Sequence, residues 1–421
     1  MLKASGLTPP PLANDCFSLP AGVNWTPVDD ALEVLRARLT PVTTTETVPL
    51  SDALNRSAAE DVHAARPHPP RANAAVDGYG FSGGRKAGRH VLRLTDDVAA
   101  AGQAAGPVPD GQAVRSLTGA QLPKGVDTIV LQEDVTLARG QIAFEGPIKP
   151  GANTRAAAED VAAGTAILPA GRHVTVGDIA LLASTGVHEL AVRTPLKVGV
   201  LSTGDELAEI GADVDDSRIF AANRPMLLSL IAQLGHVPVD LGAARDTRVD
   251  VRAKLNAGAA QCDAIVTSGG ASAGDEDHLS AVLDEDGALD LWRIAIKPGR
   301  PLALGMWAGK PVFGLPGNPV AAYVCTLVFA RPALSVLAGA GWVRPQVQMR
   351  PAAFSKSKKP GRQEYLRARL RDGQVEIFAS EGSGRVSGLS WAEGLVALPH
   401  EAVVVQPGDP VAYIPWSGFG I

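Results

Sequence analysis

LKVGVLS, residues 196–202, begins the stretch of sequence that decides the fold. Two helical patterns come after it, RPMLLSLIAQLG (224–235) and RVDVRAKLNAGAA (248–260), and a short apolar run follows each of them, VPVDLG (237–242) and DAIVTSGG (263–270). Short apolar runs bounded by Gly and Asp are typical of buried strands. Strands that alternate with helices predict a parallel sheet with helices on both faces.

The alternation continues toward the C-terminus. We expect a helix near HLSAVL (278–283), strands near WRIAI (292–296) and PVFGL (311–315), and a long helix from Pro319. The longest apolar run, residues 320–330, is too short to span a bilayer, so a buried helix is the better interpretation.

The N-terminal part predicts short helices. Residues 1–26 read as a disordered lead-in without the apolar core of a signal peptide. TPVDDALEVLRARL (26–39) predicts a helix that Asp29 or Asp30 can cap. Its expected apolar stripe is Ala31, Leu32, Val34, Leu35 and Leu39. LSDALNRSAAEDV (50–62) predicts a second short helix with Ser51 as its cap.

Two further regions predict β-structure. Between residues 76 and 147 we expect short strands near 91–94, 128–132 and 141–144, separated by Gly, Pro and Asp turns. From about residue 345 short strands and turns return, as in a small β-barrel or sandwich. Between these two β-regions, VTVGDIALLASTGV (174–187) predicts a helix.

Composition narrows the functional class. The chain has 421 residues, which favours several domains, and its net charge of −5 argues against broad nucleic-acid binding. The three cysteines, Cys16, Cys262 and Cys325, form neither a disulfide framework nor a zinc spacing, so we expect a reducing, cytoplasmic setting. Nothing in the pattern predicts a membrane span.

Three unusual loops follow expected strands, where ligands bind in open α/β sheets. The first is Gly-rich and acidic, residues 268–277, and its glycines and acids suit a phosphate and Mg²⁺. The second is Thr203-Gly204-Asp205-Glu206, and the third is Pro316-Gly317-Asn318-Pro319. Three cations, Arg293, Lys297 and Arg300, lie between them in sequence.

Taken alone, each of these features has a simpler explanation. The Gly-rich loop can be an ordinary turn, the acids can cap helices, and the cations can form a solvated strand face. Together they favour a site for a nucleotide or phosphate ester. Ordinary NTPases and dinucleotide enzymes are disfavoured, because the sequence has no Walker A loop and no GxGxxG after the first strand.

The order of motifs resembles the molybdopterin molybdenumtransferase family, which includes the E domain of gephyrin-type proteins. The resemblance covers residues 27–421 and rests on these motifs in succession: AVDGYGF (75–81), LTGAQLPKGVDTIVLQED (117–134), KPGANTR (149–155), VLSTGDEL (200–207), TSGGASAGDED (267–277), IAIKPGRP (294–301), GLPGNPVAA (314–322), GRQEYLRARL (361–370) and GSGRVSGLS (382–390).

The resemblance implies a multidomain α/β fold with a doubly wound, mostly parallel sheet of the molybdopterin-binding type. The expected parts are a lead-in (1–26), an elongated helical domain (27–70 and 148–193), an inserted β-domain (71–147), the α/β domain (194–342) and a β-barrel-like C-terminal domain (343–421). It also implies a homodimer. The implied reaction inserts molybdate into adenylylated molybdopterin, releases AMP in a Mg²⁺-dependent step and yields molybdenum cofactor.

The resemblance also implies roles for individual residues. The expected catalytic set is Asp77, Thr118, Asp205, Glu206, Asp246, Asp277 and Lys297, of which Glu206, Asp246 and Asp277 would hold the metal. The expected substrate-binding set is Gly269, Gly270, Ser272, Arg293, Arg300, Pro316, Gly317, Asn318, Pro319, Arg367, Ser387 and Ser390. Arg293 and Arg300 stand where the family often has Lys, which keeps the charge but changes the geometry.

Two rival functions remain. A molybdopterin adenylyltransferase would share the SGGASAGDED type of loop but not the β-rich flanks at 27–180 and 345–421. A non-catalytic scaffold is the second rival, and the complete set of acids with Lys297 favours catalysis over it. The adenylyltransferase is also a possible docking partner that would hand over its labile product.

Overall fold

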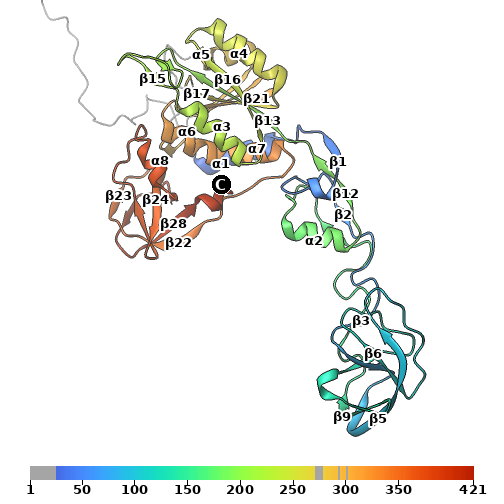
Figure 1. Ribbon diagram of the computed structural model, residues 1–421. Coiled ribbons are helices and arrows are strands. Elements are labelled where there is room, and N and C mark those ends of the chain that lie inside the picture. The colour runs from blue at the N-terminus through green and yellow to red at the C-terminus, as the bar shows by residue number, and fades with distance from the viewer. Residues whose placement is uncertain (1–24, 271–277, 293, 300–301) are drawn as a thin grey trace, which may run out of the picture. The chain divides into compact units, whose positions relative to one another are not determined.

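The computed structural model describes residues 25–270, 278–292, 294–299 and 302–421. The expected site residues Ser272, Asp277, Arg293 and Arg300 lie outside the described residues. The chain divides into two compact units, residues 44–194 and the remainder, and each is described by itself (Figure 1).

A six-stranded sheet forms the centre of the unit that contains residues 195–421. Its strand order is β16 (Val237–Ala244), β13 (Lys197–Thr203), β17 (Ala264–Ser268), β21 (Lys310–Leu315), β20 (Leu302–Trp307) and β18 (Ala288–Trp292). The first four strands are parallel. At the other edge β20 pairs antiparallel with β21, and β18 pairs antiparallel with β20. The mixed α/β organisation expected from the sequence is confirmed.

Helices cover both faces of this sheet. Successive side chains of a strand point to opposite faces, so each buried strand contributes apolar side chains to two cores. Val198 and Val200 of β13 pack with Leu227 and other residues of α3 (Asn223–Gln233) in one core. Leu201 points the other way and packs in a second core with α4 (Arg248–Gln261) and α5 (His278–Asp286). Figure 1 shows α3 and α4 on opposite sides of the sheet.

The long helix from Pro319 lies in the first core. It consists of α6 (Pro319–Cys325), a π-helical turn η3 (Thr326–Ala330) and α7 (Arg331–Leu337). In the described part of the chain it alone is long and apolar enough to cross a membrane, but 83% of its apolar window is buried inside the protein. Such burial is typical of a core helix, as the sequence predicted.

The N-terminal helix α1 (Val28–Arg38) packs into the same core through Val28, Ala31 and Leu35. The boundary between the units therefore falls at Thr43/Thr44. The cap predicted for this helix is wrong, because Pro27 occupies the N-cap position and Asp29 and Asp30 lie inside the first turn. Val34, expected in the apolar stripe, is 37% exposed.

A second six-stranded sheet makes up the C-terminal part of this unit. Its order is β19 (Ile296–Lys297), β24 (Gln363–Arg371), β26 (Gly394–Leu398), β28 (Pro410–Pro415) and β22 (Gln348–Pro351) along the main path. Its sixth strand, β25 (Gln374–Ile377), pairs with β24 off this path. Two short strands, β23 (Lys356–Lys358) and β27 (Val403–Val405), pair with each other, and α8 (Ser387–Trp391) and η4 (Trp416–Phe419) complete it.

The predicted strand at 292–296 is wrong. Strand β18 ends at Trp292, and Ile296 and Lys297 instead pair in parallel with Gln363 and Glu364 of β24. The strand β20, which the sequence analysis did not anticipate, fills the place in the first sheet between β21 and β18. Lys297 thus belongs to the C-terminal sheet rather than to the α/β sheet.

Unit 44–194 is mostly short strands. β1 (Thr45–Pro49) pairs with β12 (Glu189–Arg193), β2 (Val62–His63) with β11 (Ala166–Leu168), and β3 (Asn73–Ala74) with β10 (Thr154–Arg155). The helix α2 (Val176–Ser184) is capped by Thr175, which exchanges hydrogen bonds with Asp178. This capping box satisfies two otherwise unpaired N–H groups at the helix start.

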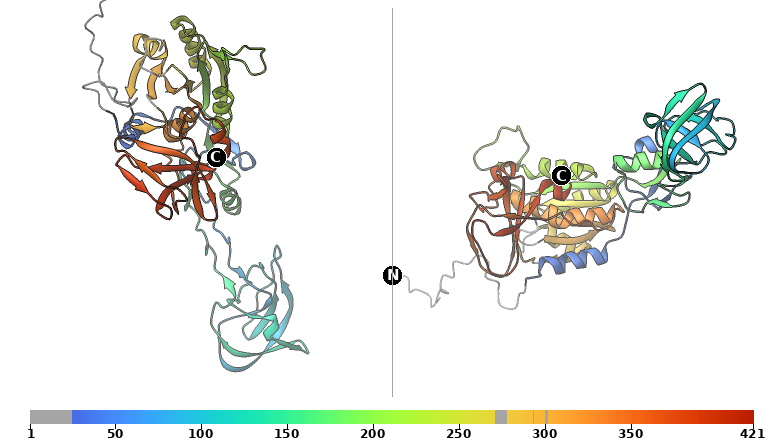
Figure 2. Two further views of the ribbon diagram at one scale, coloured as in Figure 1. Left: turned by 90° about the vertical axis from the view of Figure 1, so that its left-hand side faces the viewer. Right: turned by 90° about the horizontal axis from the view of Figure 1, so that it is seen from below.

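A six-stranded sheet forms one end of this unit (Figure 2). Its order is β7 (Thr128–Leu131), β4 (Gly78–Phe81), β6 (Gln112–Ser116), β5 (Arg85–Ala99), β9 (Gln141–Ile148) and β8 (Thr136–Ala138), and η2 (Gln132–Asp134) follows β7. Phe81, Ile142 and Phe144 lie in its core. The strands expected near 91–94, 128–132 and 141–144 fall within β5, β7 and β9.

The helix predicted at 50–62 is wrong. Only the single turn η1 (Leu50–Asp52) forms there. Asn55 adopts a left-handed φ of 63°. Its main-chain N–H donates to the Val174 carbonyl, and the Ala58 N–H donates to the Arg172 carbonyl. The backbone is therefore paired with the segment before α2, and this tertiary pairing overrides the local helical pattern.

Candidate active site

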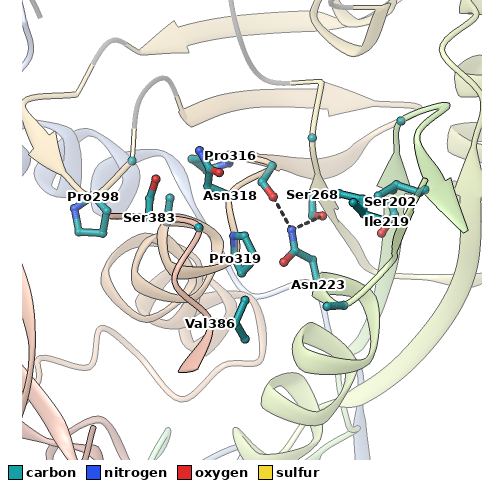
Figure 3. A pocket seen from close by; sticks show the side chains of 18 of the residues that line it. Ser202, Ile219, Asn223, Ser268, Pro298, Pro316, Asn318, Pro319, Ser383 and Val386 are labelled. Carbon is teal, nitrogen blue, oxygen red and sulfur yellow. Dashed lines mark hydrogen bonds between the residues drawn. The ribbon is translucent and has the colours of Figure 1, made fainter. Parts of the chain in front are cut away.

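A cleft of about 1380 Å³ lies where the loops after the parallel strands meet the C-terminal part of the unit. The loops after β13, β17 and β21 all contribute to its wall, as expected for the carboxyl ends of parallel strands. Site residues predicted from the sequence that line it are Glu206, Asp246, Gly269, Gly270, Lys297, Pro316, Gly317, Asn318 and Pro319. Figure 3 shows Pro316, Asn318 and Pro319 on one wall of this cleft.

Glycine at position 269 permits the close approach of two of these loops. Gly269 has a φ of 95°, and its N–H donates to the Leu315 carbonyl at 3.1 Å. A Cβ there would lie 2.6 Å from the Thr203 carbonyl oxygen. Only a residue without a side chain fits this conformation and this contact, so the loop after β17 can lie directly against the end of β13.

Asn223, at the start of α3, was not predicted from the sequence. Its Nδ2 donates to the Gly317 carbonyl at 2.7 Å and to Ser268 Oγ at 3.1 Å (Figure 3). One amide thereby connects α3, the end of β17 and the Pro-Gly-Asn-Pro turn. An Asn at the start of a predicted helix reads as an ordinary capping residue, so no signal in the sequence distinguished it.

Three polar atoms of cleft-lining residues are buried and have no hydrogen-bond partner among the described residues. They are Ser202 Oγ, Thr203 Oγ1 and Asn223 Oδ1. A buried polar atom without a partner costs about 1 to 3 kcal/mol. These atoms are therefore suited to bind a polar ligand in the cleft.

The acids of the two neighbouring loops are paired through the main chain. The Asp246 N–H donates to Asp205 Oδ1 at 3.0 Å, and the Asp205 N–H donates to Asp246 Oδ2 at 3.3 Å. Glu206 and Asp246 line the cleft, whereas Asp205 is exposed beside it. Across the described ranges no group of three His, Cys, Asp or Glu residues could hold a metal.

Lys297 lines the cleft within a cluster of four charged side chains, which we call the Lys–Glu cluster: Lys297, Lys356, Glu364 and Glu381. The Lys297 Nζ lies 2.6 Å from Glu381 Oε2 and 3.4 Å from Glu364 Oε1. Partial burial of Glu381 favours its neutral form, but the hydrogen bonds from Lys297 and Lys356 hold its pKa below the usual value.

Arg367 lies behind this cluster and is 4% exposed. It donates to the carbonyls of Ser380, Gly382 and Arg385, and its guanidinium lies 4.9 Å from the centre of the Phe378 ring. Burial lowers the pKa of Arg367. A small cavity of about 20 Å³ is lined by Lys297, Arg367, Ser380 and Glu381, among others. The structure thus brings Lys297 and Arg367 to one small cavity, a proximity that the sequence analysis did not predict.

Three family descriptions match successive parts of the chain. Residues 26–186 match "MoeA N-terminal region (domain I and II)", 199–336 match "Probable molybdopterin binding domain", and 350–416 match "MoeA C-terminal region (domain IV)". A molybdopterin molybdenumtransferase of Haemophilus influenzae is 34% identical over 401 residues, covering 93% of this chain and 98% of that protein. The chain belongs to the molybdopterin molybdenumtransferase family.

Other members of this family are similar over most of their length. "Molybdopterin molybdenumtransferase 2" of Mycobacterium tuberculosis is 32% identical and covers 86% of this chain and 93% of its own. Two crystal structures of MoeA proteins from Pyrococcus horikoshii superpose with TM-scores of 0.81 and 0.78, at 26% and 28% identity, each over 93% of this chain.

Four further residues suggested by the family resemblance are described by the structure, two in each unit. Ser387 and Ser390 are exposed on α8 and are not among the residues that line the cleft. Ser383 and Val386 from the same motif line it instead (Figure 3). Asp77 and Thr118 belong to unit 44–194, where Thr118 donates its N–H and its hydroxyl to Asp77 Oδ1 at 2.6 and 2.7 Å.

Proposed function

We propose that this protein inserts molybdate into adenylylated molybdopterin, releases AMP and yields molybdenum cofactor. The observation that supports the proposal best is the composition of one cleft. It combines a close-packed Gly-rich turn, the carboxylates of Glu206 and Asp246, and the ammonium of Lys297. Main-chain N–H groups and a cation suit phosphate, and carboxylates suit a divalent metal.

We propose a role for each group in the cleavage of the phosphate–AMP bond. One water is consumed: its oxygen bonds to one phosphorus of the phosphoanhydride, the bridging P–O bond breaks, AMP leaves, and the protons of the water pass to the two phosphate products or to solvent. Glu206 and Asp246 would hold Mg²⁺ together with Asp277, which lies outside the described residues. The bound metal would stabilise negative charge on the phosphate oxygens.

The other proposed roles concern binding. Lys297 would neutralise oxyanion charge, and Arg367 would complete the molybdate pocket, since both line the small cavity behind the cleft. Gly269, Gly270 and the turn Pro316–Pro319 would lie against the pterin phosphate. Asp205, expected from the resemblance in the catalytic set, would act by positioning Asp246. Ser272, Arg293, Arg300, Ser387 and Ser390 stay candidates for substrate binding.

Asp77 and Thr118 are proposed to act in a cleft of the homodimer. The hydrogen bonds from Thr118 lower the pKa of Asp77, so this carboxylate stays ionised. We further propose that the protein is a cytoplasmic homodimer and receives its substrate from a molybdopterin adenylyltransferase. Light scattering of the purified protein, alone and mixed with that enzyme, measures both associations.

The two rival functions, a stand-alone adenylyltransferase and a non-catalytic scaffold, make different predictions. A stand-alone adenylyltransferase is disfavoured, since the matched family regions extend far beyond residues 199–336. A scaffold would bind a partner protein without turnover.

The deciding experiment measures AMP release from adenylylated molybdopterin, with Mg²⁺ and with or without molybdate. Wild type is compared with Glu206→Gln and Lys297→Ala. The control is Glu376→Gln, which changes a surface ion pair and is not among the residues that line the cleft. We expect molybdate-dependent release by wild type and control, and a loss of about 100-fold in the two cleft variants. No release by wild type at saturating molybdate would contradict the proposal.

A further inference from the structure

The four side chains of the Lys–Glu cluster differ in how exposed they are. The side chains of Lys356 and Glu364 are 11% and 9% exposed, so both are held inside the protein. Lys297 is 26% exposed and Glu381 is 41% exposed, and both line the cleft. Glu381 is thus the member of this cluster that solvent and a ligand reach most easily.

The charges of the cluster cancel. Two ammonium groups face two carboxylates, and Lys297 and Lys356 each contact both Glu364 and Glu381. An oxyanion that approaches Lys297 with Glu381 in place therefore meets a neutral cluster with a carboxylate 2.6 Å from the ammonium it needs. Removing that carboxylate leaves a net charge of one positive unit at the same place.

On the side of Lys297 that faces Arg367, little free space remains beside Glu381. The cavity shared by Lys297, Arg367 and Glu381 measures about 20 Å³, and one water needs roughly 10 to 15 Å³ on this measure. A tetrahedral oxyanion carries four oxygens, each about the size of a water. It does not fit unless part of the wall moves.

The rest of this wall is fixed. Lys297 belongs to β19, which pairs with β24, and Arg367 belongs to β24 itself. Arg367 also holds the main chain around Glu381 by donating to the carbonyls of Ser380 and Gly382. The backbone of this loop is therefore anchored, and the Glu381 side chain is the part that can turn away.

We propose that Glu381 is a specificity-determining gate: its carboxylate occupies the position that a tetrahedral oxyanion takes beside Lys297, and the oxyanion binds by displacing it. The inference rests on the proposed function only for the identity of the oxyanion, which is molybdate or the phosphate of the substrate. The gate lowers the affinity for the oxyanion that binds beside Lys297, and it favours an anion charged enough to replace a carboxylate at two ammonium groups.

The test measures binding without turnover, by titration calorimetry of the full-length protein with molybdate, inorganic phosphate and AMP in separate arms. In Glu381→Gln we expect at least one of these anions to bind roughly threefold to tenfold more tightly than in wild type. The arm that shows the gain identifies which oxyanion the gate controls. The gain should vanish when Lys297→Ala is added to Glu381→Gln.

Two variants complete the design. Glu376→Gln, which removes a carboxylate of similar exposure from the Arg369 pair, should leave all three affinities unchanged. Glu381→Asp retracts the carboxylate by one methylene and should give a smaller gain in anion affinity. This variant replaces Glu381→Gln in the test if the Gln variant folds poorly. Unchanged or weaker binding in every arm for folded Glu381→Gln, or for Glu381→Asp in its place, overturns the gate. These readouts do not measure AMP release, so a failure of the gate is distinguishable from a failure of the proposed reaction.

Discussion

Asp205 and Asp246 each accept a hydrogen bond from the other's main-chain N–H, at 3.0 and 3.3 Å. The two residues follow the neighbouring parallel strands β13 and β16, so the reciprocal pair fixes the spacing of two loops at the mouth of the cleft. Asp246 lines the cleft, and Glu206 is adjacent in sequence to Asp205. The pair therefore positions the two described carboxylates that we propose as metal ligands.

Substitution of Asp205 should impair the reaction more than stability. In Asp205→Ala the Asp246 N–H loses its acceptor and the loop shifts, so we expect AMP release to fall roughly tenfold to hundredfold. The free energy of unfolding should change by about 1 kcal/mol or less, because the residue is exposed. Asp213→Ala, an exposed acid in the following loop, serves as control. A variant with the full wild-type rate would show that the pair has no positioning role.

Gly269 should tolerate no side chain. In Gly269→Ala the Cβ meets the Thr203 carbonyl at 2.6 Å in addition to adopting a positive φ, so we expect a loss of about 3 kcal/mol or more of unfolding free energy. Gly235→Ala is the matched control, since Gly235 also has a positive φ but no atom within 4 Å of an added Cβ. That variant should lose only about 1 to 2 kcal/mol. Chemical denaturation measures both, and equal losses would argue against the close contact.

Arg367 should be irreplaceable even by lysine. Its planar guanidinium donates to three carbonyls, and a single ammonium cannot reproduce that arrangement. We expect Arg367→Lys to cost about 1 to 3 kcal/mol of unfolding free energy and to weaken molybdate binding. Arg344→Lys, at a side chain that is 73% exposed and lies 3.9 Å from Glu33 in its ion pair, should be nearly neutral. The interpretation fails if the two variants behave alike.

The ionisation of Asp77 should depend on Thr118. The side-chain and main-chain hydrogen bonds from Thr118 lower the pKa of Asp77, so they stabilise the folded state above the pKa of the unfolded chain. That stabilisation is lost as the pH falls through the lowered pKa of the folded state. Thr118→Val should raise the pKa of Asp77 toward its ordinary value, whereas Thr118→Ser should keep it low. An NMR titration of the Asp77 carboxyl measures the difference, and an unchanged value in the Val variant would refute the assignment.

The sequence predicted best where the local pattern and the tertiary environment agree. β13, β17 and β21 are buried on both faces, so their apolar runs identified them, and the loops that follow them come together at one edge of the sheet. Gly269 and the Pro316–Pro319 turn were recognisable because their backbone conformations demand particular residue types.

Predictions failed where distant segments compete for the same backbone. The pattern at 50–62 suits a helix, but its N–H groups pair with residues before α2. The pattern at 292–296 suits a strand of the α/β sheet, but Ile296 and Lys297 join the C-terminal sheet. Neither pairing leaves a local signal, because both partners are far away in the chain.

The sequence by itself determined the alternation of strands and helices, the loops that carry the acids and glycines, and the family to which the motifs belong. Only the tertiary structure decided that Asn223 connects three cleft elements, and that Glu381 and Glu364 neutralise Lys297. The physical reason is the separation in sequence over which each kind of interaction acts. Periodicity and turn chemistry act over a few residues, whereas Lys297 meets carboxylates 67 and 84 positions away, which only folding brings within hydrogen-bond distance.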